Sequence, residues 1–258
     1  MKVALVQCPI EWADIETNLN LTERRLADIA GKADVALLPE MFTTGFCTDR
    51  PDLADTMDGI TLHAIRRLAK IYNIALAGSF MAAEKQNLYN RGFFIMPDGK
   101  EIFVDKRHLY AHGGEADFFT AGNRRPIIEF KGCRFCLQIC YDLRFPVWIR
   151  NSTGYDYDIL LYSANWPQIR IQYWDALVKA RAIENQSYVC AVNRVGDDGL
   201  GLHYNGHSVA YDTQLNPLAS FEDNEEGVKI ADFDIERLNH YRQVLPLWKD
   251  ADKFRLEI

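Results

Sequence analysis

Short apolar runs recur along the chain and alternate with polar stretches. Each run is apolar on consecutive positions, and the runs lie at residues 3–6, 35–38, 74–76, 92–96, 159–162 and 188–192. A strand that is covered on both faces carries such a pattern, because neither face meets water. The runs therefore predict strands of sheets that are buried on both sides.

Helical spacing appears between these runs. Apolar residues recur every three to four positions in three segments, through Leu19, Leu26 and Ile29, through Leu62, Ile65, Ala69 and Tyr72, and through Tyr173, Leu177 and Ala180. We expect Asp58 to cap the second of these helices. Strands and helices mixed in this way predict an α/β or α+β protein in which helices cover a sheet.

The last quarter of the chain has a different pattern. It predicts a glycine-rich surface loop at 196–201, a strand meander at 205–212, 214–221 and 227–233, and a short helix near 235–241. No repeat, low-complexity tract or Pro/Gly/Ser linker interrupts the sequence. We therefore expect a single domain over residues 1–258.

The composition narrows the classes of protein that fit. Of the 258 residues, 48% are hydrophobic and 25% are charged, which excludes an intrinsically disordered chain. The net charge is -7 and the basic residues are scattered, so a nucleic acid is disfavoured as a partner. No run approaches the roughly 20 apolar residues of a membrane span, and the N-terminus has no signal-peptide pattern. We expect a cytoplasmic protein with no membrane partner.

Six cysteines raise the question of metal or redox chemistry. In a cytoplasmic chain they are expected to be reduced, and each is then a buried small residue, a metal ligand or a nucleophile. Cys133, Cys136 and Cys140 have metal-like spacing, with His108 and His112 as candidate further ligands. Within one strand, however, Cys133 points away from the other two cysteines. This pleating argues against a zinc site and against a disulfide switch between Cys133 and Cys136.

Three polar residues stand where apolar strands end. Glu40 follows V-A-L-L-P, Lys106 follows I-F-V-D, and Cys140 follows L-Q-I. A buried carboxylate suits a general base, and an ammonium suits stabilisation of an anion. A thiol near a helix start and a lysine is expected to have a lowered pKa and to act as a nucleophile. Each also has a plainer interpretation: a solvated carboxylate, a lysine head in water and a small buried thiol.

The three motifs together resemble the nitrilase superfamily of carbon–nitrogen hydrolases, over nearly the whole chain. The motifs are L-P-E-M-F around Glu40, D-K-R-H-L around Lys106 and C-Y-D-L-R-F-P from Cys140. Within the superfamily, S-A-N-W-P, A-R-A-I-E-N-Q and N-R-V-G-x-D-G look like the omega-amidase branch. The resemblance implies a four-layer αββα sandwich and a homodimer, with the C-terminal tail, about 235–258, in subunit contacts.

The resemblance also implies roles for individual residues. Cys140 corresponds to the nucleophile, Glu40 to the general base and Lys106 to the cation that stabilises the intermediate. A second glutamate of the family falls on Glu115, whose alternative is an exposed loop carboxylate. The thiolate would attack an amide carbonyl and form a thioester, with the backbone N–H of Tyr141 as a further oxyanion donor and with no metal or organic cofactor.

The same branch implies the substrate, a short 2-oxo dicarboxylic acid monoamide such as 2-oxoglutaramate or 2-oxosuccinamate. Arg144 is the candidate for binding its carboxylate, or else it pairs with Asp142 or Glu184. Trp166 either walls the pocket or fills the core.

Other activities remain open from the sequence. The same three residues also fit a nitrilase, an N-carbamoyl hydrolase or an amidase for a deaminated peptide, because leaving-group selectivity depends on pocket shape. A non-catalytic scaffold of the same fold is a further alternative, which the intact set of Glu40, Lys106 and Cys140 disfavours.

Overall fold

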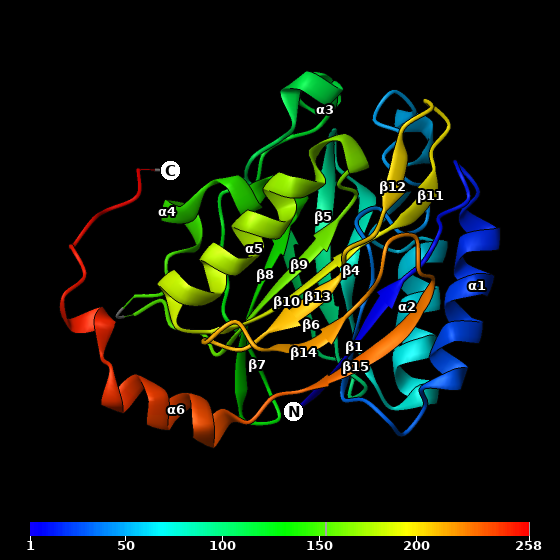
Figure 1. Ribbon diagram of the computed structural model, residues 1–258. Coiled ribbons are helices and arrows are strands. Elements are labelled where there is room, and N and C mark those ends of the chain that lie inside the picture. Colours follow the sequence, from blue (N-terminus) through cyan, green and yellow to red (C-terminus); the bar gives the residue numbers. More distant parts are fainter. Residues whose placement is uncertain (153, 258) are drawn as a thin grey trace.

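Two large β-sheets pack face to face at the centre of the molecule (Figure 1), whose computed structural model describes residues 1–152 and 154–257. The first sheet has the strand order β15-β1-β2-β4-β5-β6, and β3 pairs with the far part of β4. Its strands are β1 (Lys2–Gln7), β2 (Val35–Leu37), β3 (Asp55–Thr56), β4 (Ala75–Glu84), β5 (Asn87–Ile95), β6 (Glu101–Asp105) and β15 (Gly227–Asp232).

The second sheet has the order β14-β13-β10-β9-β8-β7. Its strands are β7 (Ile128–Phe130), β8 (Cys133–Ile139), β9 (Ile159–Ala164), β10 (Tyr188–Asn193), β13 (Val209–Tyr211) and β14 (Pro217–Ser220). A separate antiparallel hairpin consists of β11 (Val195–Asp197) and β12 (His203–Asn205). In both large sheets the central strands β1–β2–β4 and β8–β9–β10 run parallel, so their carboxyl ends lie along common edges.

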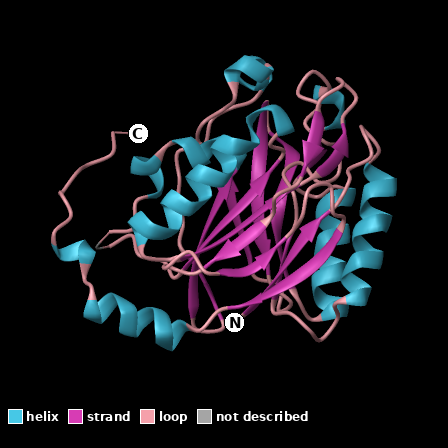
Figure 2. Ribbon diagram, viewed as in Figure 1, coloured by secondary structure: helices cyan, strands magenta, loops and turns pink. Residues whose placement is uncertain are grey.

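Helices cover the outer face of each sheet (Figure 2). The first sheet carries α1 (Ile15–Asp28) and α2 (Ile60–Tyr72), and the second carries α4 (Pro146–Ile149) and α5 (Ile171–Asn185). Short helical turns and the remaining helices are η1 (Pro51–Leu53), η2 (Ala111–Gly113), α3 (Glu115–Phe118), η3 (Cys140–Arg144), η4 (Gln168–Arg170), α6 (Ile235–Val244) and η5 (Leu247–Lys249). The layers confirm the predicted αββα sandwich. Within the described ranges, no helix is long and apolar enough to cross a membrane.

The side-chain alternation of β1 shows why the strands are apolar on consecutive positions. Val3 and Leu5 point into the layer between the two sheets, whereas Ala4 and Val6 point toward α1 and α2. Both faces of the strand are therefore buried. Full burial stabilises the fold by about 1.5–3 kcal/mol for each large aliphatic side chain.

Two details of the helix predictions are wrong. The buried stripe of α5 lies one residue later than expected, through Trp174 and Val178, while Tyr173 is 56% exposed. Arg181 belongs to the buried stripe and donates to the carbonyl of Leu143, so a polar residue concealed this face in the sequence. Asp58 does not cap α2 either.

The predicted meander at the end of the chain is also wrong. β13 and β14 pair in the second sheet, but β15 crosses to the first sheet and pairs with β1. The segment 205–212 is shorter than predicted, because Asn205 ends the hairpin strand β12 and only 209–211 joins the large sheet. Periodicity alone carries no information about which sheet a strand joins.

Candidate active site

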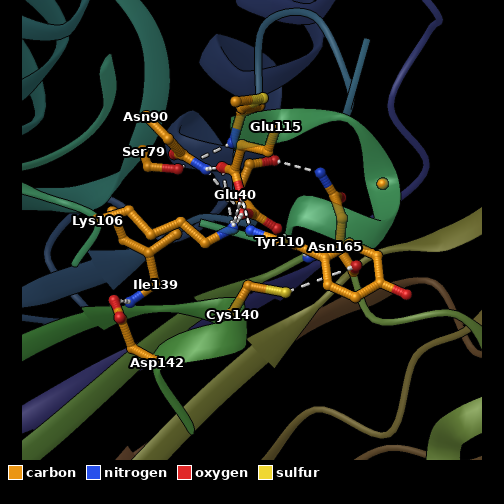
Figure 3. A network of polar contacts seen from close by, with 12 residues as sticks. Glu40, Ser79, Asn90, Lys106, Tyr110, Glu115, Ile139, Cys140, Asp142 and Asn165 are labelled. Atoms are coloured by element: carbon orange, nitrogen blue, oxygen red, sulfur yellow. Dashed lines mark hydrogen bonds and ion pairs between the residues drawn. The ribbon is translucent and has the colours of Figure 1, made fainter. Parts of the chain in front are cut away.

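Four side chains predicted to carry chemistry converge at one end of the two sheets (Figure 3). Glu40 follows β2, Lys106 follows β6, Cys140 follows β8, and Glu115 is the first residue of α3. Their exposed fractions are 0%, 1%, 8% and 0%, respectively. The plainer interpretations of Glu40, Lys106 and Glu115 as solvated side chains are therefore wrong.

Lys106 lies between the two glutamates. Its Nζ is 2.8 Å from Oε1 of Glu40, and 3.0 Å and 2.8 Å from Oε1 and Oε2 of Glu115. Burial disfavours the ammonium, but the two carboxylates outweigh it and raise the pKa of Lys106. The cluster therefore holds two carboxyl groups for one ammonium. Burial, with Glu40 adding to it and Lys106 opposing it, raises the pKa of Glu115.

Asn165 joins Glu40 to Cys140. Its backbone N–H donates to Oε2 of Glu40 at 2.9 Å, and its side-chain amide donates to the backbone carbonyl of Glu40 at 2.9 Å. The carbonyl of Asn165 in turn accepts the thiol of Cys140 at 3.7 Å. The base and the thiol therefore share one backbone support that follows β9.

The Cys140 thiol is protonated at rest, contrary to the lowered pKa that we expected. Burial raises the pKa of the Cys140 thiol well above its usual range, Glu40 raises it further, and Lys106 only partly opposes them. The nearby lysine is already neutralised by two glutamates. A base must therefore remove the proton before the sulfur can attack.

The backbone at Cys140 is turned out of the strand. β8 ends at Ile139, and Cys140 adopts a φ of 43°, a left-handed conformation that a cysteine rarely occupies. Asp142 supports this turn by accepting the N–H of Ile139 at 3.3 Å and that of His108 at 2.9 Å. The loop that carries Lys106 is thus tied to the turn that carries Cys140.

The cysteines and histidines considered as metal ligands do not converge on one point. His108 Nδ1 lies 2.8 Å from Asp142, and Cys133 faces the layer opposite to Cys136 and Cys140. Among the described residues, no group of three or more His, Cys, Asp or Glu side chains is placed to hold a metal ion. All six cysteines are free thiols.

A cavity of about 100 Å³ opens above the thiol. Its wall mixes aromatic and charged groups from several loops and comprises Phe46, Lys106, Tyr110, Gly113, Cys140, Tyr141, Arg144, Asn165, Trp166, Pro167, Arg170, Asp198, Leu200, Leu202 and Tyr204. Tyr141, Arg144 and Trp166, the three candidates for contact with a substrate, therefore all line the cavity. Trp166 is both wall and core, because it is buried and its ring lies 5.7 Å from that of Trp174.

Arg144 has neither of the acidic partners that we considered for it. Asp142 pairs with His108, and Glu184 pairs with Arg181. The Arg144 guanidinium lies instead over aromatic rings, 4.9 Å from the centre of Trp166 and 5.1 Å from that of Tyr173. Among the described residues, Arg144 forms no ion pair, and its guanidinium faces the cavity.

Three features of the site had escaped the sequence analysis. Arg170 brings a second guanidinium to the cavity, 5.6 Å above the ring of Tyr110. The glycine-rich loop is at the surface as predicted, but its residues Asp198 and Leu200 also line the cavity, as does Leu202 directly after it. Asn90, buried on β5, donates to both glutamates. Asn90 follows a polar stretch and Arg170 precedes a helix, so neither had a distinctive signal.

The αββα sandwich and the buried glutamate, lysine and thiol at one edge of it agree with the class of hydrolytic enzymes that the sequence motifs resemble. Comparison of the whole sequence with known proteins gives the same class. The chain belongs to the carbon–nitrogen hydrolase family, whose profile matches residues 2–243. It is 41% identical to the omega-amidase YafV of Escherichia coli over 99% of this chain and 98% of the relative. It is 31% identical to the 2-oxoglutaramate amidase of Bacillus subtilis over 97% of each.

A solved structure has the same fold over the whole chain. It is a CN-hydrolase superfamily protein from Xanthomonas campestris with an arsenic adduct in its active site. The TM-score is 0.97 at 38% identity, covering 100% of this chain and 99% of the other. The predicted family and fold are therefore confirmed.

Proposed function

We propose that this protein is an omega-amidase that hydrolyses the terminal amide of a short 2-oxo dicarboxylic acid monoamide, such as 2-oxoglutaramate or 2-oxosuccinamate. One observation carries the proposal. The thiol of Cys140 and the ammonium of Lys106, which is paired with the buried Glu40, line a cavity whose wall also holds two arginines without a carboxylate partner among the described residues. Full-length relatives named omega-amidase and 2-oxoglutaramate amidase support it.

Catalysis begins with transfer of the thiol proton of Cys140 to Glu40. The sulfur attacks the amide carbon, and the carbonyl electrons move onto oxygen. Lys106 and the backbone N–H of Tyr141 stabilise this oxyanion. Such donors are effective in a buried site because they need no reorganisation during the reaction.

The second half of the reaction releases both products. Glu40 gives its proton to the leaving nitrogen, so that ammonia departs and a thioester remains. Glu40 then takes a proton from water, and the hydroxide attacks the thioester. Collapse of the second tetrahedral intermediate frees the dicarboxylate and returns the proton to Cys140. Glu115 holds Lys106 in position throughout.

The arginines account for selection of the substrate. Arg144, with Arg170 beside the cavity, binds the substrate carboxylate, because a planar guanidinium matches a carboxylate in geometry and charge. An amino acid amide such as glutamine would bring an ammonium toward the same cations. Asp198, the acid among the described lining residues, already accepts the Tyr204 hydroxyl and two backbone N–H groups of its own turn. An oxo group avoids this mismatch.

The proposal extends to the assembly of the enzyme and its place in the cell. We infer a single-domain enzyme that works in the cytoplasm as a homodimer, with residues 235–258 at the subunit interface. Support comes from the apolar side chains that this segment exposes, including Val244, Trp248 and Phe254.

Ammonia release from 2-oxoglutaramate by the purified protein tests the proposal. We expect turnover that exceeds that of glutamine or a simple nitrile and that disappears in Cys140→Ala. Cys133→Ala is the matched control, because Cys133 is a buried thiol at the start of β8, the strand that Cys140 follows, and faces the layer between the two sheets. If the enzyme turned over only a nitrile, an N-carbamoyl compound or a deaminated peptide, the substrate assignment would be wrong and that compound class would take its place. A folded protein that turns over none of these would overturn enzyme function.

A further inference from the structure

Asn90 touches both glutamates and the backbone of the lysine. Its side-chain nitrogen Nδ2 lies 2.8 Å from Oε1 of Glu40 and 2.9 Å from Oε1 of Glu115 (Figure 3). The backbone carbonyl of Asn90 accepts the backbone N–H of Lys106 at 3.0 Å. Asn90 is fully buried on β5 and does not line the cavity. It therefore belongs to the support of the site, outside the substrate surface.

The orientation of the Asn90 amide follows from charge. Nδ2 faces two carboxylate oxygens, whereas Oδ1 meets no donor among the described residues. Turning the amide over would place its oxygen against both carboxylates, an arrangement that repels unless both are protonated. The two N–H groups therefore donate one to each glutamate.

The donors around the glutamates leave one oxygen incompletely satisfied. A carboxylate oxygen accepts two hydrogen bonds in the plane of its group. Oε1 of Glu40 and Oε1 of Glu115 each accept Asn90 and Lys106. Oε2 of Glu115 accepts Lys106 and the N–H of Tyr110. Oε2 of Glu40 accepts only the N–H of Asn165 among the described residues.

The oxygen that has room for a proton is therefore Oε2 of Glu40, whose supporting residue Asn165 also holds the Cys140 thiol. We propose that Asn90 is a positioning residue that keeps the catalytic proton on Oε2 of Glu40 by occupying Oε1 of both glutamates. The proton leaves the sulfur of Cys140 as the S–H bond breaks, and the new O–H bond forms on Oε2. This inference rests on the proposed role of Cys140, and it holds for any amide substrate.

Loss of the Asn90 amide changes where the proton can reside. Oε1 of each glutamate then has a vacant acceptor position, so a proton can bind on the side away from the thiol. The titratable groups that face one another here are Glu40, Lys106, Glu115 and Cys140. Because N–H donors favour the ionised form of a carboxyl group, fewer of them also make the cluster bind a proton more readily.

Asn90→Leu tests this by removing both donors while keeping the branching and the number of side-chain heavy atoms. We expect kcat for 2-oxoglutaramate to fall on the order of 10- to 100-fold, with KM unchanged within about threefold. The acid limb of the kcat profile moves to higher pH by about one unit, which corresponds to tenfold easier protonation. Asn185→Leu is the control, because it removes a buried amide at the far end of α5. It is expected to lower stability and leave the pH profile unchanged.

A second readout does not depend on the substrate. The rate at which iodoacetamide alkylates Cys140, followed by mass spectrometry across pH, should show the same shift of the acid limb in Asn90→Leu. If the wild type fails on 2-oxoglutaramate, this measurement still decides the role of Asn90. Asn90→Asp keeps the shape but replaces the donor by an acid, and we expect its acid limb to move further. Wild-type profiles in both variants, or in Asn90→Asp alone if Asn90→Leu does not fold, would overturn the proposal.

Discussion

Replacement of Lys106 by methionine tests the charge balance and the chemistry of the site together. Methionine fills most of the same volume but leaves Glu40 and Glu115 buried without a cation. Removing one partner of a buried ion pair costs about 3–5 kcal/mol, since the remaining charge is uncompensated. For a chain of this size that is a fall in Tm on the order of 10 °C. The loss of an oxyanion donor lowers kcat by about 10²–10³.

A double variant separates the loss of stability from the loss of kcat. Lys106→Met combined with Glu115→Gln removes one of the stranded carboxylates, so we expect it to be more stable than Lys106→Met alone, with no recovery of kcat. Urea unfolding gives the stability, and ammonia release gives the rate. Lys131→Met is the control, because Lys131 pairs with Asp34 at the surface, where an ion pair contributes at most about 1 kcal/mol.

Two outcomes would refute the reasoning. Lys106→Met as stable as the Lys131→Met control would mean that the buried glutamates do not need the cation. Recovery of kcat in the double variant would mean that Lys106 acts only by neutralising charge, and does not stabilise the oxyanion.

Two further predictions concern the cavity and a histidine outside it. Arg144→Met should lower kcat/KM for 2-oxoglutaramate by about 10- to 100-fold, as loss of a hydrogen bond between charged groups does, and leave an uncharged amide such as butyramide unaffected; equal losses on both amides would contradict carboxylate binding. His207 bridges Asp175 and Asp223 at 3.0 Å and 2.6 Å. Burial disfavours its charge, but the two acids outweigh it and raise the pKa of His207 above its usual value. Its stabilising contribution is therefore complete below about pH 6.5 and is lost as the pH rises through the raised pKa. Urea unfolding across pH should show this loss in the wild type and a smaller one in His207→Gln; identical slopes would contradict it.

The sequence predicted those site residues whose position depends on strand ends. Glu40, Lys106 and Cys140 each follow an apolar run, and parallel strands bring their carboxyl ends to common edges. The strands themselves could be predicted from the apolar runs, because both of their faces are buried. Family motifs then supplied what periodicity does not, including Glu115 in a short helix.

Other features depend on contacts between distant segments, which no local pattern encodes. Asn165 meets Glu40 across 125 positions in the sequence, and Asn90 meets it across 50. The pKa of the Cys140 thiol was predicted in the wrong direction for the same reason. The effect of Lys106 on the thiol depends on how many carboxylates already neutralise it, and that number appears only in the folded site.

On the proposed function, the charges in and behind the cavity wall are expected to govern both binding and release. Two glutamates flank the one lysine behind the thiol, whereas Arg144 and Arg170 are cations of the cavity wall, so we expect a substrate carboxylate to bind at the arginines. A molecule with a carboxylate at one end and an amide at the other is thus turned with its neutral amide toward Cys140. Hydrolysis converts that amide into a second carboxylate beside Glu40. We therefore expect the product dicarboxylate to bind more weakly than the substrate monoamide, because its second carboxylate lies beside a glutamate.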